Sequence, residues 1–433
     1  MGDLREIAQK VQNTIEDAKL TMARFSVEEK ETQEFTMEHG EFSLFRTLFD
    51  KNLSVTVFQE QKKGSASTNK VDDAAIKAVV EAAVASAESS VADEAYGIAP
   101  KQETEKFMVG VYEPDMDKLF ERTRELSEDI KTEFPKIQVM QIIVTHEKVH
   151  EIYWNTNGTE FETTAGCYNI TIEFSGNDGE KTTSLNYSGI RCTDLSRPLI
   201  ELAAIRRQLA DTEKQLEVKP MEGKFQGTVV LMPECVNEFL YYITSCFASD
   251  NVILEKTSIW LNKLGEQVAD PRITVAFNPI DERLMDYERY TYDGFKAEPE
   301  YFIQDGILRS FKTTLYVANK SGTAPAKNTS YSIVVNAGET PYEEIIGNVK
   351  QGLLLGGFSG GQPGNNGEIS GVAKNSFLIE DGKVTTPVNE VMITGNLAEM
   401  LQNVVAISKE TVEDGTCVVP YIAVDGVVVS GKN

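Results

Sequence analysis

The sequence predicts an α+β protein with two domains: helices and antiparallel strands in residues 1–222, and a β-rich part with a few helices in residues 223–433. Two observations favour this class. Helical spacing of apolar residues alternates with strand-like, period-two stretches in the first half. After residues 219–223 the composition shifts toward strands, turns and glycine, which is typical of a domain boundary. At 433 residues, 41% hydrophobic and 25% charged, the chain can form two sizeable cores.

The first half opens with a helix, whose apolar stripe includes Leu4, Ile7 and Val11. Apolar and polar residues then alternate from residue 21 to residue 61. A turn is expected at His39-Gly40, where we expect His39 to be exposed.

Further helices and strands complete the first half. One helix follows the capping residue Asp72, and another spans about residues 115–134. Strands are expected at about residues 165–174 and 182–188, followed by an amphipathic, charged helix at about residues 198–215.

Residues 146–150, His-Glu-Lys-Val-His, match the HExxH pattern of zinc peptidases. That pattern needs a helix, where histidines four residues apart can share one zinc while the glutamate polarises the metal-bound water. The flanking residues are β-branched and alternating, which instead predicts two strands joined by a short connection near residues 145–148. On a strand, His146 and His150 would lie about 13 Å apart at about 3.3 Å per residue.

That separation is too large for one zinc, and a third ligand is also missing. The third of the three histidines, His39, lies far upstream. We therefore interpret the HExxH segment as a polar hairpin, and a zinc site at His146 and His150 stays open as the alternative.

The second half begins with an apolar strand at residues 225–232 and a helix at residues 233–247, which starts with a proline. A hairpin at residues 379–384 and a strand at residues 390–395 follow later. The inward-facing residues of the helix are expected to be Cys235, Phe239, Leu240, Ile243 and Cys246.

Residues 356–367 are rich in glycine, which permits backbone to approach a ligand or another chain closely. No phosphate-loop pattern is present, and the acidic surroundings disfavour phosphate. Two interpretations stay open: a long loop over a sheet edge, or a substrate-binding surface. The candidate residues for such a surface are Gly356, Gly357, Gly360 and Gly361.

The chain is strongly acidic, with a net charge of -25 spread over nearly every segment. Such a surface repels phosphate backbones, so direct binding of nucleic acid is not expected. The five cysteines form no CxxC pair, which favours reduced thiols in a cytoplasmic protein. No export signal and no membrane association are expected, because no apolar run approaches the length of a membrane span.

Several motifs together resemble the TldD/PmbA family, and more closely its PmbA (TldE) branch, over essentially the whole chain. The most specific block runs from Asn375-Ser376-Phe377 through residues 387–390 to Ile393-Thr394-Gly395-Asn396-Leu397. The shorter motifs lie at residues 64–69 with the following Asp72, 155–158, 264–268 and 305–308.

The resemblance implies a two-domain protein of cytoplasmic proteolysis, with residues 223–433 corresponding to the family's metallopeptidase-type domain. In TldD the metal-binding helix carries a His-Glu-x-x-x-His motif, and a cysteine near the C-terminus is a further ligand. The equivalent helix here should begin at Pro233, and it contains no histidine. Cys417 lies roughly where the TldD cysteine is expected, but a single thiolate does not hold a zinc, so we interpret it as a buried small hydrophobe.

The leading hypothesis from the resemblance is a PmbA/TldE-like subunit of a peptide-processing assembly, without catalytic residues or a metal site of its own. No cofactor is then expected in this chain, and the zinc belongs to a TldD-like metallopeptidase subunit. The chain would help to hold an extended peptide or unfolded protein substrate by β-augmentation.

Two alternatives stay open: an active zinc metallopeptidase in its own right, and a homodimeric peptide-binding or scaffold protein without a peptidase role. The family is also described as a modulator of DNA gyrase. Because the chain is so acidic, we expect any such effect to be indirect, through turnover of a protein regulator.

Overall fold

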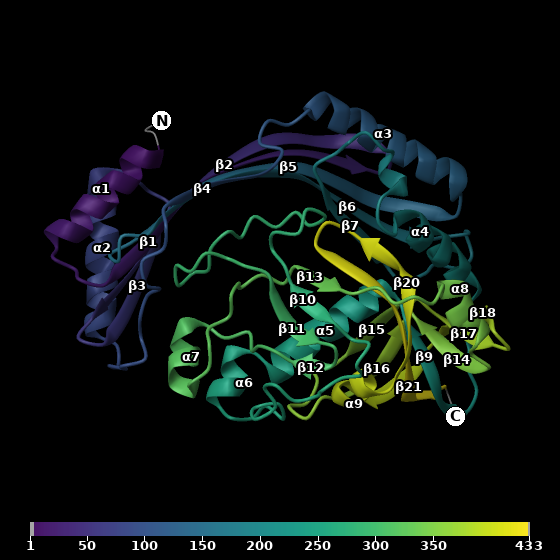
Figure 1. Cartoon of the computed structure of the whole chain (residues 1–433). Helices are drawn as coiled ribbons and strands as arrows, with labels where there is room; N and C mark the ends of the chain where they lie inside the picture. Colours follow the sequence, from purple (N-terminus) through teal and green to yellow (C-terminus); the bar gives the residue numbers. More distant parts are fainter. Residues whose placement is uncertain (1–3, 432–433) are drawn as a thin grey trace.

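The computed structural model of the chain describes residues 4–431 and confirms the α+β class (Figure 1). A long curved sheet fills the first half and arches over the second half. Its central pairs are antiparallel, and only the short edge strand β4 runs parallel to its neighbour, β6. Its strands are β1 (Ala23–Glu38), β2 (Glu41–Gln59), β3 (Lys62–Thr68), β4 (Glu105–Gly110), β5 (Ile137–Asn155), β6 (Glu160–Gly176) and β7 (Asn186–Cys192), in the order β3-β2-β1-β5-β6-β4 with β7 also on β6.

Helices cover the outer face of this first sheet in two separate places. The helices α1 (Leu4–Asp17) and α2 (Asp73–Glu88) pack at one end, and α3 (Met116–Glu133) and α4 (Ile205–Lys214) at the other (Figure 1). Strand β5 contributes to both cores: Ile152 packs with α1 and α2, and Ile142 packs with α3 and α4. These residues share one face because side chains alternate along a strand. The opposite face of β5 is therefore left to look toward the second half.

The second sheet has fourteen strands, and β21 lies near its centre. The main path runs β12-β11-β10-β13-β21-β9-β14-β17-β18-β8, while β15, β16 and β19 form a branch that joins β21, as does β20. The strands are β8 (Lys219–Pro220), β9 (Lys224–Leu231), β10 (Val275–Phe277), β11 (Glu300–Gln304), β12 (Ile307–Leu308), β13 (Ile333–Val335), β14 (Gln351–Leu355), β15 (Gly357–Gly360), β16 (Glu368–Lys374), β17 (Ser376–Glu380), β18 (Lys383–Asn389), β19 (Met392–Asn396), β20 (Val404–Glu413) and β21 (Cys417–Ser430).

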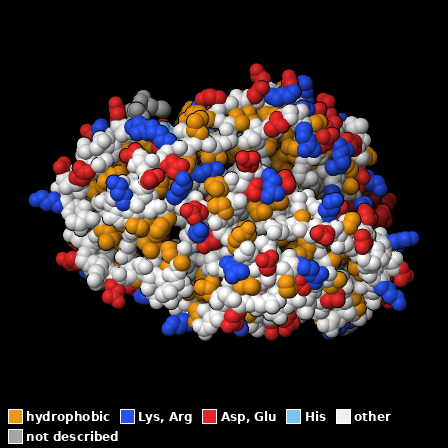
Figure 2. Space-filling model, in the orientation of Figure 1, with side chains coloured by type: hydrophobic (Ala, Val, Ile, Leu, Met, Phe, Trp, Pro, Cys, Tyr) orange, Lys and Arg blue, Asp and Glu red, His pale blue; other side chains and the backbone are white. Residues whose placement is uncertain are grey.

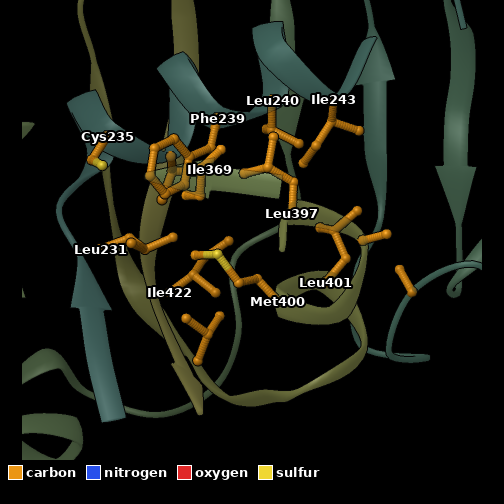
Figure 3. Close-up of a cluster of buried hydrophobic side chains, with 14 of the residues drawn as sticks. Leu231, Cys235, Phe239, Leu240, Ile243, Ile369, Leu397, Met400, Leu401 and Ile422 are labelled. Carbon is orange, nitrogen blue, oxygen red and sulfur yellow. The ribbon is translucent and has the colours of Figure 1, made fainter. Parts of the chain in front are cut away.

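The helix α5 (Pro233–Phe247) lies on this sheet and was predicted at these residues. Figure 3 shows Cys235, Phe239, Leu240 and Ile243 pointing into a cluster of apolar side chains. That cluster fixes the rotation of α5, and so decides which side chains point away from the core. The remaining helices of the second half are short: α6 (Asp250–Leu254), α7 (Leu315–Ser321), α8 (Tyr342–Gly347) and α9 (Leu397–Gln402).

Polar contacts join the two halves. Arg24 of β1, only 3% exposed, lies 2.7 Å from Asp293, and its guanidinium stacks 3.8 Å from the Tyr292 ring. A second ion pair connects Asp93 with Lys320 of α7 at 2.5 Å. The boundary predicted after residue 222 falls between β8 and β9, although β8 already pairs with β18 of the second sheet.

The structure corrects three predicted elements. Residues 137–155 form one uninterrupted strand, so the expected connection near residues 145–148 is wrong: β1 and β6 pair with β5 on both sides through this stretch. The strand expected at residues 182–188 lies at 186–192. The helix expected at residues 198–215 is broken at Ala203, which has a positive φ of 48°, into the 3-10 turn Leu199–Glu201 and α4.

Charged side chains of both signs are interspersed over the face seen in Figure 2, with no continuous basic area. The exposed turn at His39 is confirmed, with a φ of 50°. Within residues 4–431, no helix has the length and apolar character that crossing a lipid bilayer would require.

Candidate functional site

The first turn of α5 lies at the seam between the two halves of the protein. Pro233 occupies the first helical position, where its missing N–H costs nothing. Because the core residues of α5 face the second sheet, the Glu234 and Asn237 side chains point toward α4 and the segment around residue 189. The seam therefore presents a helix start to residues from the first half.

Glu234 is held by two side chains of α4. It forms an ion pair with Arg207, and Gln208 Nε2 donates a hydrogen bond to its Oε1 at 2.9 Å. Arg207 Nη1 also lies 3.5 Å from Asp211 Oδ2. Both side chains of the Arg207–Glu234 pair are mostly buried, at 27% and 33% exposure. The carboxylate of Glu234 is thus neutralised by an arginine from the first half.

A pocket of about 140 Å³ lies beside this ion pair, and Pro233, Glu234, Asn237 and Cys417 all line it. Cys417 begins β21, and its thiol lies 3.7 Å from Asp414 Oδ2. Burial, together with this carboxylate, raises the pKa of the Cys417 thiol well above its ordinary value. In the absence of a metal ion, the sulfur is therefore a protonated thiol at neutral pH.

Glu234, Asn237 and Cys417 offer few free donors to a zinc ion. Zinc sites use three or four thiolate, imidazole or carboxylate donors. Here the Cys417 thiol lies against Asp414, the Glu234 carboxylate is occupied by Arg207, and Asn237 is a weak donor. Among residues 4–431, no group of three or more His, Cys, Asp or Glu side chains is arranged to hold a metal ion.

Glu238, one turn further along α5, reaches the strand β15. It accepts a hydrogen bond from the Phe358 backbone N–H and another from the Tyr242 hydroxyl at 2.9 Å. Burial raises the pKa of Glu238, although both hydrogen bonds oppose this effect. Because the Phe358 N–H is directed to Glu238, it points away from β16, the strand with which β15 pairs among the described residues. The outer edge of β15 thus lies next to α5, and its Phe358 N–H is already bonded to Glu238.

The four candidate glycines lie on or beside this edge, but they are not equivalent. A Cβ on Gly356 would meet the Asn375 carbonyl oxygen at 2.3 Å, and a Cβ on Gly360 would meet the Phe358 ring at 2.5 Å. Gly357 has only ordinary contacts, and Gly361 has open space around it. Packing alone therefore explains the glycine at two of the four positions. Gly356 also lines a small pocket beside Glu234.

The HExxH histidines lie on β5 and have separate partners. His146 is 1% exposed, and its Nε2 lies 2.7 Å from the Val111 carbonyl oxygen, so Nε2 carries the proton and donates it. Burial lowers the pKa of His146, which keeps the ring neutral. His150 Nε2 lies 3.0 Å from Glu162 Oε1. The strand conformation confirms that this segment is not the helix of a zinc peptidase.

A larger cavity, about 270 Å³, lies between the inner face of the first sheet and residues 286–292. Glu28 and Glu151 are directly opposite each other on β1 and β5, and Tyr290 lies nearby. Burial raises the pKa of Glu151 to about 7. No local sequence pattern pointed to this cluster, since its members are 123 or more residues apart in the chain.

Comparisons with known proteins agree over most of the chain. Residues 223–431 match the family model described as PmbA/TldA metallopeptidase C-terminal domain, and residues 23–87 match PmbA/TldA metallopeptidase domain 1. Metalloprotease PmbA of Escherichia coli O157:H7 is 23% identical over 423 residues, covering 90% of this chain and 88% of that protein. A metalloprotease of Methanothermobacter thermautotrophicus is 29% identical over 197 residues, so the match spans only 43% of that relative's length.

Solved structures share the fold over nearly the full length. TldE from Thermococcus kodakarensis superposes with a TM-score of 0.85 at 19% identity, covering 98% of this chain and 100% of that one. A candidate modulator of DNA gyrase from Bacteroides thetaiotaomicron gives a TM-score of 0.84 at 21% identity, covering 99% of each chain.

The fold and the matched models define a protein with the architecture of the PmbA/TldA metallopeptidase domains. The chain belongs to the PmbA/TldD family, on its PmbA branch.

Proposed function

We propose that the chain is a PmbA/TldE-like subunit that lacks a metal site of its own and supports peptide processing by a TldD-like metallopeptidase partner. The observation that carries this proposal is the state of Glu234, which is paired with Arg207 in the pocket that also contains Cys417. A general base or metal-polarising carboxylate needs to be free to exchange protons with a water molecule. In this chain the α5 carboxylate is committed to a structural ion pair.

The position of Glu234 also supports an alignment with the metal-binding helix of TldD. If Glu234 occupies the place of the glutamate in His-Glu-x-x-x-His, then Pro233 and Glu238 occupy the places of the two histidines. Pro233 has no donor atom in its side chain, and Glu238 is hydrogen-bonded to Phe358 and Tyr242. Each position of the motif thus carries a side chain with a structural role.

The outer edge of β15 supports a role in holding peptide. An extended peptide can add to such an edge through main-chain hydrogen bonds, with little demand on its sequence. On β15 the outward-facing backbone groups belong to Phe358 and Gly360. The Phe358 N–H already bonds Glu238, so the Phe358 carbonyl and the Gly360 groups are left for a peptide, and Gly361 leaves open space beside them. The relative named zinc metalloprotease TldD homolog, from Saccharolobus solfataricus, illustrates the kind of partner that would supply the zinc.

A reconstitution experiment tests this function. The chain and a family member that carries His-Glu-x-x-x-His would be purified separately and incubated with an unstructured fluorogenic peptide. We expect no cleavage by the chain alone, and chelator-sensitive cleavage by the mixture that exceeds the partner's own rate severalfold. Chelator-sensitive cleavage by the chain alone, or a mixture no faster than the partner, would overturn the proposal.

A matched pair of variants locates the peptide. Gly361→Val adds a side chain beside the β15 edge where no atom lies within 4 Å, so it should leave the fold intact and reduce cleavage by the mixture. Gly347→Ala, at the end of α8, also adds a side chain into open space and serves as the control. Equal cleavage with both variants would contradict a role for β15.

A further inference from the structure

The cavity of about 270 Å³ lies beneath the arch of the first sheet (Figure 1). Its floor is the inner face of β1, β2 and β5, and its roof is part of the segment between β10 and β11, residues 286–292. Four tyrosines line it: Tyr153, Tyr287, Tyr290 and Tyr292. We call this space the tyrosine cavity. Ligand pockets in proteins have volumes of about 300–1,000 Å³, so this cavity fits a small molecule or a single side chain.

Two carboxyl groups meet at one end of the floor. Glu28 of β1 and Glu151 of β5 are directly opposite each other, so their side chains project from the same face of the sheet. Within residues 4–431, neither forms an ion pair with a lysine, arginine or histidine. Lys30, the next residue of β1 on this face, pairs with Glu147 instead, at 2.9 Å. We call Glu28 and Glu151 the acidic pair. Burial raises the pKa of both carboxyl groups.

The charged groups of the roof are compensated locally. Asp286 and Glu288 accept hydrogen bonds from residues 329–332. Arg289 donates to three backbone carbonyl oxygens. The acidic pair is therefore the uncompensated charge of the cavity. Water can form hydrogen bonds with these carboxyl groups, but it supplies no positive charge, whereas a cationic ligand would supply both.

Two buried polar atoms of residues that line the cavity have no hydrogen-bond partner in the described part of the chain. They are Nε of Arg24, whose side chain is 3% exposed, and the hydroxyl of Tyr290. The remainder of Arg24 is engaged, because Nη1 bonds Asp293. The Tyr290 hydroxyl lies near Glu151, but not in the geometry of a hydrogen bond. Since buried polar atoms are nearly always bonded in folded proteins, a ligand in the cavity can supply the missing partners.

The aromatic rings of the cavity favour an organic cation. Ring faces attract ammonium and guanidinium groups. This chemistry is already present at one end, where the Arg24 guanidinium lies 3.8 Å from the centre of the Tyr292 ring. Near the acidic pair, Tyr287 stacks on no other ring among the described residues, and the Tyr290 ring is fixed 5.0 Å from that of Tyr153. Carboxyl groups and ring faces thus lie together on both sides of one space.

We propose that the tyrosine cavity binds an organic ammonium ion, with its ammonium group between the acidic pair and the rings of Tyr287 and Tyr290, and with a hydrogen-bond acceptor of the ligand at Arg24. Arg24 and Glu28 are four residues apart on β1, or about 13 Å at about 3.3 Å per residue, so the ligand is elongated. An aliphatic amine that also carries a carbonyl group has this chemistry. It is shared by a free amino acid or amino amide and by a lysine side chain of a peptide. The inference does not depend on the proposed peptidase role, because binding is a property of this chain alone.

Isothermal titration calorimetry on the purified chain gives the first test. The probe is 6-aminohexanamide, and the matched neutral probe is heptanamide, in which a methyl group replaces the ammonium group. We expect 6-aminohexanamide to bind and heptanamide to bind at least about tenfold more weakly, because it lacks the charge. Equal affinity for the two probes would overturn the proposal.

A second pair of probes distinguishes the source of the ammonium group. N-acetyl-lysine N-methylamide presents a lysine as a peptide does, and its norleucine counterpart lacks the ammonium group. If the capped lysine binds at least as tightly as 6-aminohexanamide, the ligand is a lysine of a peptide. If only 6-aminohexanamide binds, the ligand is a free small molecule. If neither ammonium probe binds, the proposal is wrong.

Variants test the position of the ammonium group. Glu151→Gln replaces a buried acid by an uncharged amide of the same shape, so the fold should persist, and we expect affinity for the ammonium probe to fall about tenfold or more. Glu173→Gln is the matched control, because it removes the same charge from β6 outside the cavity. Tyr287→Phe keeps the ring and should retain binding, whereas Tyr287→Leu should weaken it severalfold. Equal affinity of the wild type and Glu151→Gln would overturn the proposal, whatever the outcome of the reconstitution experiment.

Discussion

Arg207 of α4 forms an ion pair with Glu234 in the first turn of α5, and Gln208 donates a second hydrogen bond to the same carboxylate. One contact thus has two effects. It ties the first half of the protein to the second, and it occupies the acidic group that a metal centre on α5 would need. In the proposed function, the stability of the seam and the lack of a metal site have the same structural origin.

Replacing Arg207 should destabilise the protein. Arg207→Ala leaves a mostly buried carboxylate without its cation, and we expect the free energy of unfolding to fall by roughly 1–3 kcal/mol. Urea denaturation followed by fluorescence measures this change. Arg206→Ala is the matched control, because Arg206 is 46% exposed in its ion pair with Glu133, against 27% for Arg207, and such surface pairs contribute only about 0–1 kcal/mol. Equal losses for the two variants would argue against a special role for the seam pair.

Replacing Arg24 should destabilise the protein more than replacing Arg207. It is 3% exposed, pairs with Asp293 and stacks on Tyr292. Arg24→Ala leaves Asp293 uncompensated at a buried seam, and we expect a loss of about 3–5 kcal/mol in the free energy of unfolding. Lys10→Ala, which breaks an exposed ion pair with Asp73, should leave the midpoint of thermal unfolding unchanged. A small effect of Arg24→Ala would mean that the two halves do not depend on this contact.

Glu151 should make stability depend on pH. Burial raises its pKa from 4.5 to about 7, so the folded state keeps a proton that the unfolded state releases between these values. Burial of Glu151 therefore lowers the free energy of unfolding progressively as the pH rises from about 4.5 to 7. Glu151→Gln removes this effect. Above pH 7 we expect the free energy of unfolding of the variant to exceed that of the wild type by up to about 3 kcal/mol, and near pH 4 we expect the two values to match. A stability difference that does not change with pH would refute this account of Glu151.

His146 should contribute to the stability of the fold and should have no role in binding metal. Its imidazole is buried, packs 5.1 Å from the Tyr168 ring, and donates to the Val111 carbonyl. His146→Ala leaves that carbonyl without its donor and creates a cavity, so we expect a loss of about 2–4 kcal/mol. His150→Ala, at a more exposed position of the same strand, should lower the free energy of unfolding by less. Denaturation of both variants measures the difference, and a reversed order would be unexpected.

Much of the fold could be predicted because local patterns were strong. The helix from Pro233 to Phe247 was predicted at its observed ends, since a proline at the first position and a clear apolar face define it. Strand character around His146 also followed from its β-branched neighbours. The connection expected near residue 145 was wrong because the polar residues there lie on a strand between two neighbours, where pairing with β1 and β6 overrides local polarity.

The candidate site was less accessible to sequence reasoning. The absence of histidine from α5 was visible in the sequence, but the Arg207–Glu234 pair was not, because it depends on how α4 packs against the second half. The four glycines share one composition signal, yet only tertiary packing separates Gly356 and Gly360, which have close neighbours, from Gly361, which does not. Their role in binding peptide stays a prediction.

The zinc content of the purified chain tests the central claim most directly. After incubation with zinc and removal of the excess, elemental analysis would be run on the wild type, on His146→Ala and on Cys417→Ala. We expect far less than one zinc per chain in all three proteins. About one zinc per wild-type chain, lost in either variant and accompanied by chelator-sensitive cleavage of an unstructured peptide, would show that the chain carries its own metal centre and would contradict the account.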